Sequence, residues 1–98
     1  YDGAYGAITA LEIIEVLNEN KIITNHPLEV IIFQNEEGGL VGSRAMAGKL
    51  KKEALSQTSA SGYTIAEGIK RLGGDPERLQ QAARKPGDLA AFIEVHIE

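Results

Sequence analysis

The chain has 98 residues, a net charge of −4, 43% hydrophobic residues and no cysteine. This length suits one small domain, and the acidic balance gives no support to nucleic-acid binding. Without cysteine, disulfides and thiolate metal sites are excluded, so a metal would have to be bound by carboxylate and imidazole groups.

Two further absences concern location. No apolar stretch approaches the ~20 residues of a membrane helix, and no signal peptide is visible. We therefore expect a cytoplasmic protein without a membrane partner. The sequence begins at Tyr1 rather than Met, so we expect it to be a segment of something longer.

The first element, Ala4 to about Glu19, is predicted to be a helix. Glu12, Glu15 and Glu19 form a narrow polar stripe at helical spacing, and most other residues are apolar. Such a helix should be largely covered, as when it packs on a sheet. The turn that follows contains His26, which we interpret as a surface residue.

Pro27 to Gln34 is predicted to be a strand. Its apolar run has no polar alternation, so both faces should be buried, as in a central strand of an α/β sheet. A glycine-containing loop comes next, and Ser43 to Leu50 is predicted to be a short helix.

The second half is predicted to hold two more short helices and a strand. Thr64-Ile65-Ala66-Glu67 is a capping-box pattern that opens a helix to about Leu72. Asp75-Pro76 is an N-cap followed by proline, which opens another helix to Arg84. Leu89 to Ile97 alternates, so Leu89, Ala91, Ile93, Val95 and Ile97 should pack while His96 lies on the polar face. The predicted fold class is α/β: an incomplete segment of a mixed sheet flanked by helices.

The strongest candidate for chemistry is Asn35-Glu36-Glu37-Gly38-Gly39, directly after the predicted buried strand. In a metal-assisted hydrolase, one carboxylate can hold a metal while its neighbour handles the proton of the attacking water. Taken alone, two glutamates in a loop are more often a solvated surface.

Asp2 and His96 bracket this pair near the two ends of the sequence. Each has an ordinary alternative: Asp2 could be a helix N-cap, and His96 an exposed or hydrogen-bonded strand residue. Because sites in open α/β sheets form at the carboxyl ends of strands, we expect both to approach the Glu36–Glu37 loop. Asp2, Glu37 and His96 would then supply the oxygen and nitrogen ligands that zinc or a similar divalent ion prefers.

Six sequence blocks carry a resemblance to a known family. They are residues 1–6, 11–12, 26–30, 35–38, 42–48 and 87–98. Together and in this order they resemble the N-carbamoyl-L-amino-acid hydrolase and allantoate amidohydrolase group. These are dinuclear-metal amidohydrolases related to the aminoacylases and metallo-carboxypeptidases, and the resemblance covers nearly the whole chain.

The resemblance implies a zinc-exopeptidase-like catalytic domain with two divalent ions, zinc or manganese. Asp2 would bridge the two metals, Glu37 would ligate one and His96 the other. Glu36 would be the general base, taking a proton from a water shared by the metals. The implied reaction is hydrolysis of a linear C–N bond in a small molecule, an N-carbamoyl amino acid or a ureido acid such as allantoate.

The match is incomplete in ways that shape the expectation. The family has histidine ligands upstream of Asp2 and near its C-terminus, and a lid domain through which the enzyme forms a homodimer. We therefore interpret residues 1–98 as a partial catalytic, metal-binding domain that is inactive alone. Gly39-Leu40-Val41 stands where many family members have a longer loop, so the resemblance does not decide which substrate the chain prefers. The alternatives are an aminoacylase or peptidase of the same superfamily, or a truncated inactive chain.

Overall fold

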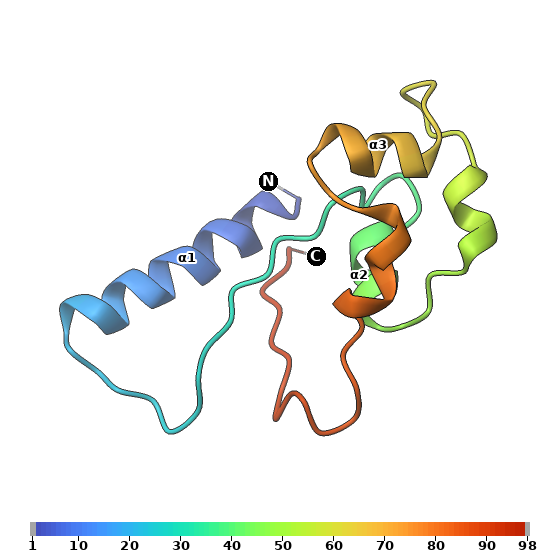
Figure 1. Cartoon of the computed structure of the whole chain (residues 1–98). Helices are drawn as coiled ribbons and strands as arrows, with labels where there is room; N and C mark the ends of the chain where they lie inside the picture. Colours follow the sequence, from blue (N-terminus) through green and yellow to red (C-terminus); the bar gives the residue numbers. More distant parts are fainter. Residues whose placement is uncertain (1, 98) are drawn as a thin grey trace. The chain divides into compact units, whose positions relative to one another are not determined.

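A computed structural model describes residues 2–97, which divide into two compact units. Of the described residues, the first unit combines residues 2–32 with residues 91–97, and the second holds residues 33–90. Five helical elements occur in the order α1 (Ala4–Glu19), α2 (Val41–Met46), η1 (Lys52–Ser56), α3 (Ile65–Arg71) and η2 (Pro76–Ala82) (Figure 1). No described helix is long and apolar enough to cross a membrane.

Helix α1 has the bounds that the sequence predicts. The helix begins after Gly3, whose positive φ of 62° glycine adopts without steric cost. No side chain caps the helix. It ends at Asn20, whose backbone N–H and side-chain amide both donate to the carbonyl oxygen of Val16, at 3.1 and 2.8 Å. These bonds satisfy one of the last carbonyls of the helix.

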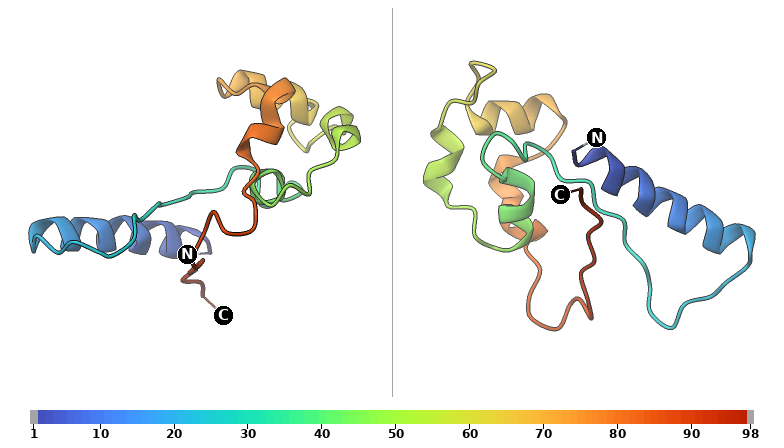
Figure 2. Two further views of the ribbon diagram at one scale, coloured as in Figure 1. Left: turned by 60° about the horizontal axis from the view of Figure 1, so that its bottom comes forward. Right: turned by 180° about the vertical axis from the view of Figure 1, so that it is seen from behind.

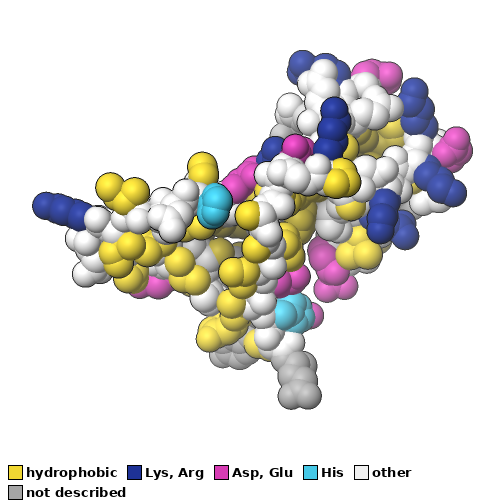
Figure 3. Space-filling view, turned by 90° about the horizontal axis from the view of Figure 1, so that it is seen from below, with side chains coloured by type: hydrophobic (Ala, Val, Ile, Leu, Met, Phe, Trp, Pro, Cys, Tyr) yellow, Lys and Arg dark blue, Asp and Glu magenta, His cyan; other side chains and the backbone are white. Residues whose placement is uncertain are grey.

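The predicted covering of α1 is wrong for this chain, because none of its residues is buried. Ile8 is 66% exposed and Leu11 is 54% exposed. Figure 3 shows hydrophobic side chains open to solvent in the part of the molecule that holds α1. The helical spacing of apolar residues therefore predicted the helix correctly. Residues 2–97 do not cover its apolar side chains as predicted.

The two predicted strands are not formed among the described residues. Residues 27–34 and 89–97 follow paths without a ladder of backbone hydrogen bonds. The expected burial is also wrong: Ile32 is 57% exposed, Leu89 40%, Ile93 87% and Val95 37%, and Ala91 is exposed as well. A strand is stabilised by partners that satisfy its N–H and C=O groups and cover its side chains, and neither segment has such a partner here. The mixed sheet remains a prediction.

The second unit is a cluster of short helices, seen from further sides in Figure 2. Helix α3 contacts η1 and η2, and η2 also contacts α2. The buried residues are few: Val41 and Ala45 from α2, Ile65 from α3 and Pro76 from η2. The backbone N–H of Arg84 donates to the carbonyl oxygen of Met46 at 2.7 Å, which fixes the end of η2 against the end of α2.

Two helices of this unit differ from their predictions in bounds or type. Helix α2 ends at Met46 rather than Leu50, because Gly48 adopts a positive φ of 67° and the chain closes with a bond from the N–H of Lys49 to the carbonyl oxygen of Arg44. Element η2 is a 3₁₀ helix that ends at Ala82. Element η1, Lys52–Ser56, was not predicted at all.

Helix α3 confirms its predicted capping box. The Thr64 hydroxyl accepts a bond from the N–H of Glu67 at 3.2 Å, and the N–H of Thr64 donates to the Glu67 carboxylate at 2.8 Å. Gly73, with a φ of 84°, follows the helix as expected. Asp75 also caps η2 as predicted, accepting a bond from the N–H of Glu77 at 3.0 Å.

Candidate metal and catalytic site

Asp2 and His96 come together in the first unit, although they lie near opposite ends of the sequence. The Nε2 atom of His96 is 3.0 Å from the Oδ1 atom of Asp2, and the two side chains are 51% and 68% exposed. On its other side, the Nδ1 atom of His96 is 2.6 Å from the carbonyl oxygen of Ile97. Both ring nitrogens thus face oxygen atoms that accept hydrogen bonds.

This arrangement constrains what can lie between the two side chains. A neutral imidazole carries a single N–H and can donate to only one of the two oxygens. Both contacts are satisfied if the ring is doubly protonated, or if Nδ1 keeps its proton and a cation lies between Nε2 and the carboxylate. An imidazole nitrogen and a carboxylate oxygen are the donors that a divalent ion such as zinc uses. The pair therefore fits a metal ion chemically.

The alternative reading of Asp2 as a helix N-cap is wrong. Gly3 occupies the N-cap position of α1, and no side chain caps the helix. The Asp2 carboxylate contacts His96 instead.

Gly6 brings the start of α1 against the segment that carries His96. A Cβ atom at Gly6 would overlap the carbonyl oxygen of Val95. Glycine is therefore required for this approach, since a backbone carbonyl cannot rotate aside like a side chain. The sequence held a weak signal, because a glycine inside a helical pattern costs about 1 kcal/mol relative to alanine and so invites a packing reason.

Glu36 and Glu37 lie in a turn of the second unit that spans residues 36–39. The N–H of Leu40 donates to the carbonyl oxygen of Glu36 at 3.1 Å. Asn35 and Leu40 flank the turn with positive φ angles of 54° and 58°, which sequence reasoning did not anticipate. Both glutamate side chains are exposed.

The structure thus joins two of the four predicted site residues. Glu36 and Glu37 belong to the other unit, so one site shared by all four stays a prediction. Among residues 2–97, no three acidic, histidine or cysteine side chains gather closely enough to hold a metal ion. His26 is exposed, as predicted, and so are Glu12, Glu15 and Glu19.

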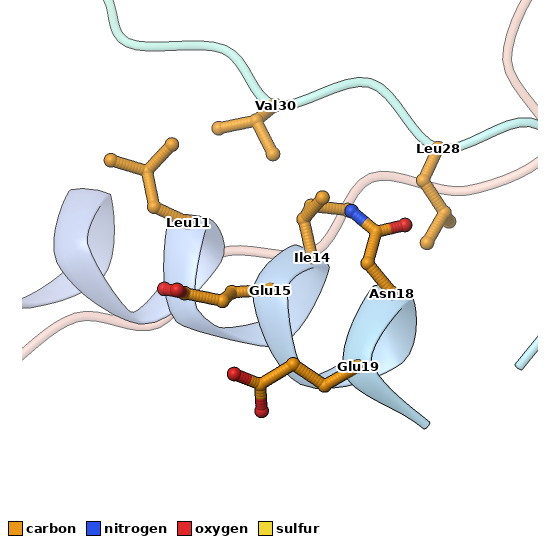
Figure 4. A pocket seen from close by; sticks show the side chains of 7 residues that line it. All are labelled: Leu11, Ile14, Glu15, Asn18, Glu19, Leu28 and Val30. Atoms are coloured by element: carbon orange, nitrogen blue, oxygen red, sulfur yellow. The ribbon is translucent and has the colours of Figure 1, made fainter. Parts of the chain in front are cut away.

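An open groove of about 570 Å³ lies along α1 in the first unit, facing Leu28 and Val30 (Figure 4). Leu11 and Ile14 line it with apolar surface, and Glu15, Asn18 and Glu19 contribute its polar atoms. None of the four predicted site residues lines this groove. It is an uncovered apolar surface rather than a place for the chemistry that the carboxylates suggest.

The described residues thus contain a carboxylate–imidazole pair in the first unit and a turn with two glutamates in the second. The sequence model of one protein family, described as "Peptidase family M20/M25/M40", matches residues 1–98. The chain therefore belongs to this family. The first block of the resemblance begins at Tyr1 and the last block ends at Glu98, and these two residues lie outside the described residues.

Individual relatives confirm the resemblance found in the sequence. The chain is 48% identical to an N-carbamoyl-L-amino acid amidohydrolase of Geobacillus stearothermophilus, over all of this chain and 25% of that protein. It is 39% identical to an enzyme of nearly the same name from Paenarthrobacter aurescens, over all of this chain and 25% of that protein. An allantoate deiminase of Arabidopsis thaliana is 34% identical, over all of this chain and 20% of its own length. The chain thus spans about a quarter, or less, of these relatives.

Proposed function

We propose that the chain is part of the catalytic domain of a metal-dependent amidohydrolase. Its substrate would be an N-carbamoyl amino acid or a ureido acid such as allantoate, cleaved at a linear C–N bond. The observation that carries the proposal is the 48% identity, over the whole chain, to a protein named N-carbamoyl-L-amino acid amidohydrolase. The contact between Asp2 and His96 supports it independently, because it pairs two donors of the predicted metal site.

Asp2, Glu37 and His96 are the residues that would hold metal. Zinc and manganese both suit a set of carboxylate and imidazole donors. Divalent ions in such a site polarise the scissile carbonyl and lower the pKa of water. The carbonyl of Ile97 accepts a hydrogen bond from Nδ1 when that nitrogen carries the proton, and in this tautomer the Nε2 lone pair could bind a metal ion.

Glu36 is the proposed general base. Its carboxylate takes a proton from the attacking water as the new C–O bond forms at the carbonyl carbon. When the C–N bond breaks, the same carboxyl group gives that proton to the leaving nitrogen, so the protons balance. The glutamates need separate roles, because one carboxylate cannot bind a cation and transfer a proton equally well.

The proposal extends to the longer protein. There the segments 27–34 and 89–97 would be strands of a mixed α/β sheet of the zinc-exopeptidase type, covered by other parts of the polypeptide. A lid domain would complete the substrate pocket and form a homodimer. We place the enzyme in the cytoplasm.

A second function, an aminoacylase or peptidase, is favoured by the family description, which names peptidases. To separate the two, the full-length protein should be loaded with zinc or manganese and offered an N-carbamoyl amino acid, allantoate, an N-acetyl amino acid and a dipeptide. We expect turnover of the first or second, loss of activity with a chelator and recovery when metal is restored. Turnover of only the third or fourth would establish the alternative, and turnover of none would refute both.

A further inference from the structure

We infer that Gly42 is a positioning residue for Glu36 and Glu37: by lacking a side chain, it lets the start of α2 bind the backbone immediately before the glutamate turn. The inference deepens the proposed function, on which its catalytic consequence rests. Its structural part depends only on contacts within the second unit.

The first step concerns the hydrogen bonds at the start of α2. The first N–H groups of a helix have no partner within the helix, and α2 has no side-chain cap. The structure supplies backbone carbonyls instead. The N–H of Leu40 donates to Glu36, that of Val41 to Asn35 at 3.4 Å, and that of Gly42 to Gln34 at 3.2 Å. Three consecutive donors thus bind the chain that leads into and forms the turn.

The second step concerns space. A Cβ atom at Gly42 would lie 3.0 Å from the nitrogen and 3.1 Å from the oxygen of Gln34, and 3.4 Å from the Cβ of Phe33. Two of these three atoms belong to the backbone, so they cannot move away by a change of rotamer. A side chain at position 42 would push the two segments apart by a few tenths of an ångström, at the point where the Gly42–Gln34 bond forms.

The third step concerns rigidity on the far side of α2. Val41 and Ala45 are among the few buried residues of the chain. The end of the helix is fixed by the bond from Arg84 to Met46. Because α2 is held in this way, added bulk at Gly42 would displace the glutamate turn rather than the helix. Asn35 and Leu40, with positive φ at both ends of the turn, mark a backbone that its surroundings hold in place.

The test uses Gly42→Ala in the full-length, metal-loaded protein, with Gly68→Ala as a matched control. Gly68 lies in α3, where a Cβ would meet no atom within 4 Å. A general base displaced by less than 1 Å weakens the transition state more than substrate binding. We therefore expect kcat on an N-carbamoyl amino acid to fall about tenfold in Gly42→Ala with KM within about twofold. Gly68→Ala should match the wild type.

Hydrogen exchange of the peptide covering residues 34–42, followed by mass spectrometry, provides the second readout. The backbone N–H groups of this peptide should exchange faster in Gly42→Ala than in the wild type, and those of the other peptides should exchange at unchanged rates. A wild-type kcat in Gly42→Ala, or faster exchange spread over all peptides, would overturn the inference.

The exchange measurement also separates this inference from the proposed function. If the wild-type protein turns over no substrate, the proposed function fails, and exchange of residues 34–42 alone decides the role of Gly42. If Gly42→Ala does not fold, hydrogen exchange in the wild-type protein tests the inference instead. The N–H groups of residues 40–42 should then be protected in the wild type, although they open a helix without a side-chain cap, and unprotected rates would refute the inference.

Discussion

Asp2 illustrates how a single residue can satisfy a sequence rule and still do something else. An aspartate just before a helix is a favoured N-cap. Here Gly3 takes the cap position with a positive φ of 62°, and the Asp2 carboxylate contacts His96. The cap interpretation relied on local sequence alone. The observed contact depends on the return of the chain to the start of α1 near its other end. The sequence suggested it only indirectly, because the strand-end argument and the resemblance each assign Asp2 and His96 to one site.

Gly6 gives the first prediction. In the full-length protein, Gly6→Ala should be destabilising by about 1–3 kcal/mol, because the new methyl group overlaps the Val95 carbonyl. Alanine is otherwise the better helix former, so Gly68→Ala, where the space is open, should be neutral or stabilising by up to about 1 kcal/mol. Thermal unfolding of the two variants measures the difference. Equal melting temperatures would show that α1 and the His96 segment do not approach closely.

The paired glutamates give the second prediction. In the metal-loaded full-length protein, Glu36→Gln should keep its metal but lower kcat by about 10²-fold or more, because the amide cannot accept the proton. Glu37→Gln should instead weaken metal binding, since a ligand charge is lost. Metal content by elemental analysis and turnover of an N-carbamoyl amino acid distinguish the two effects. Unchanged turnover in Glu36→Gln would reject the base assignment.

At the scale of elements, local signals predicted the structure well. The bounds of α1, the capping box of α3 and the Asp75–Pro76 start of η2 all depend on residues close in sequence. The segments 27–34 and 89–97 depend on partners that the sequence pattern implies but does not contain. Apolar runs and alternation predict what a segment would do in a sheet, and only pairing and covering make it a strand.

The capping box of α3 gives the third prediction, on pH. Bonds from the N–H and hydroxyl of Thr64, with Arg71 and Lys70 nearby, hold the pKa of Glu67 below its ordinary value of 4.5. A folded-state pKa below the unfolded value stabilises the fold above the unfolded pKa, and this contribution is lost as pH falls through the folded pKa. Glu67→Ala should therefore be destabilising at pH 7, with a penalty that shrinks below about pH 4.5.

A matched control for this experiment is Glu53→Ala. Glu53 lies in the first turn of η1, and its carboxylate has no hydrogen bond among residues 2–97. Its removal should have a small effect on stability at pH 7. Thermal unfolding of both variants between pH 3 and pH 7 makes the comparison. A penalty for Glu67→Ala that stays constant over this range would contradict the assigned role of the ionised carboxylate.

At the scale of the whole molecule, the final prediction is that the 98-residue chain alone binds divalent metal weakly and shows no turnover. Each metal of the proposed site needs about three protein ligands. Residues 2–97 hold no group of three metal-binding side chains, and the Asp2–His96 pair is half exposed or more, so water competes for the ion. Calorimetric titration with zinc should give weak binding that His96→Ala weakens further, whereas the full-length protein should bind tightly. Stoichiometric binding of two ions by the 98-residue chain, together with amidohydrolase activity, would contradict the ligand count and place the missing donors within this segment.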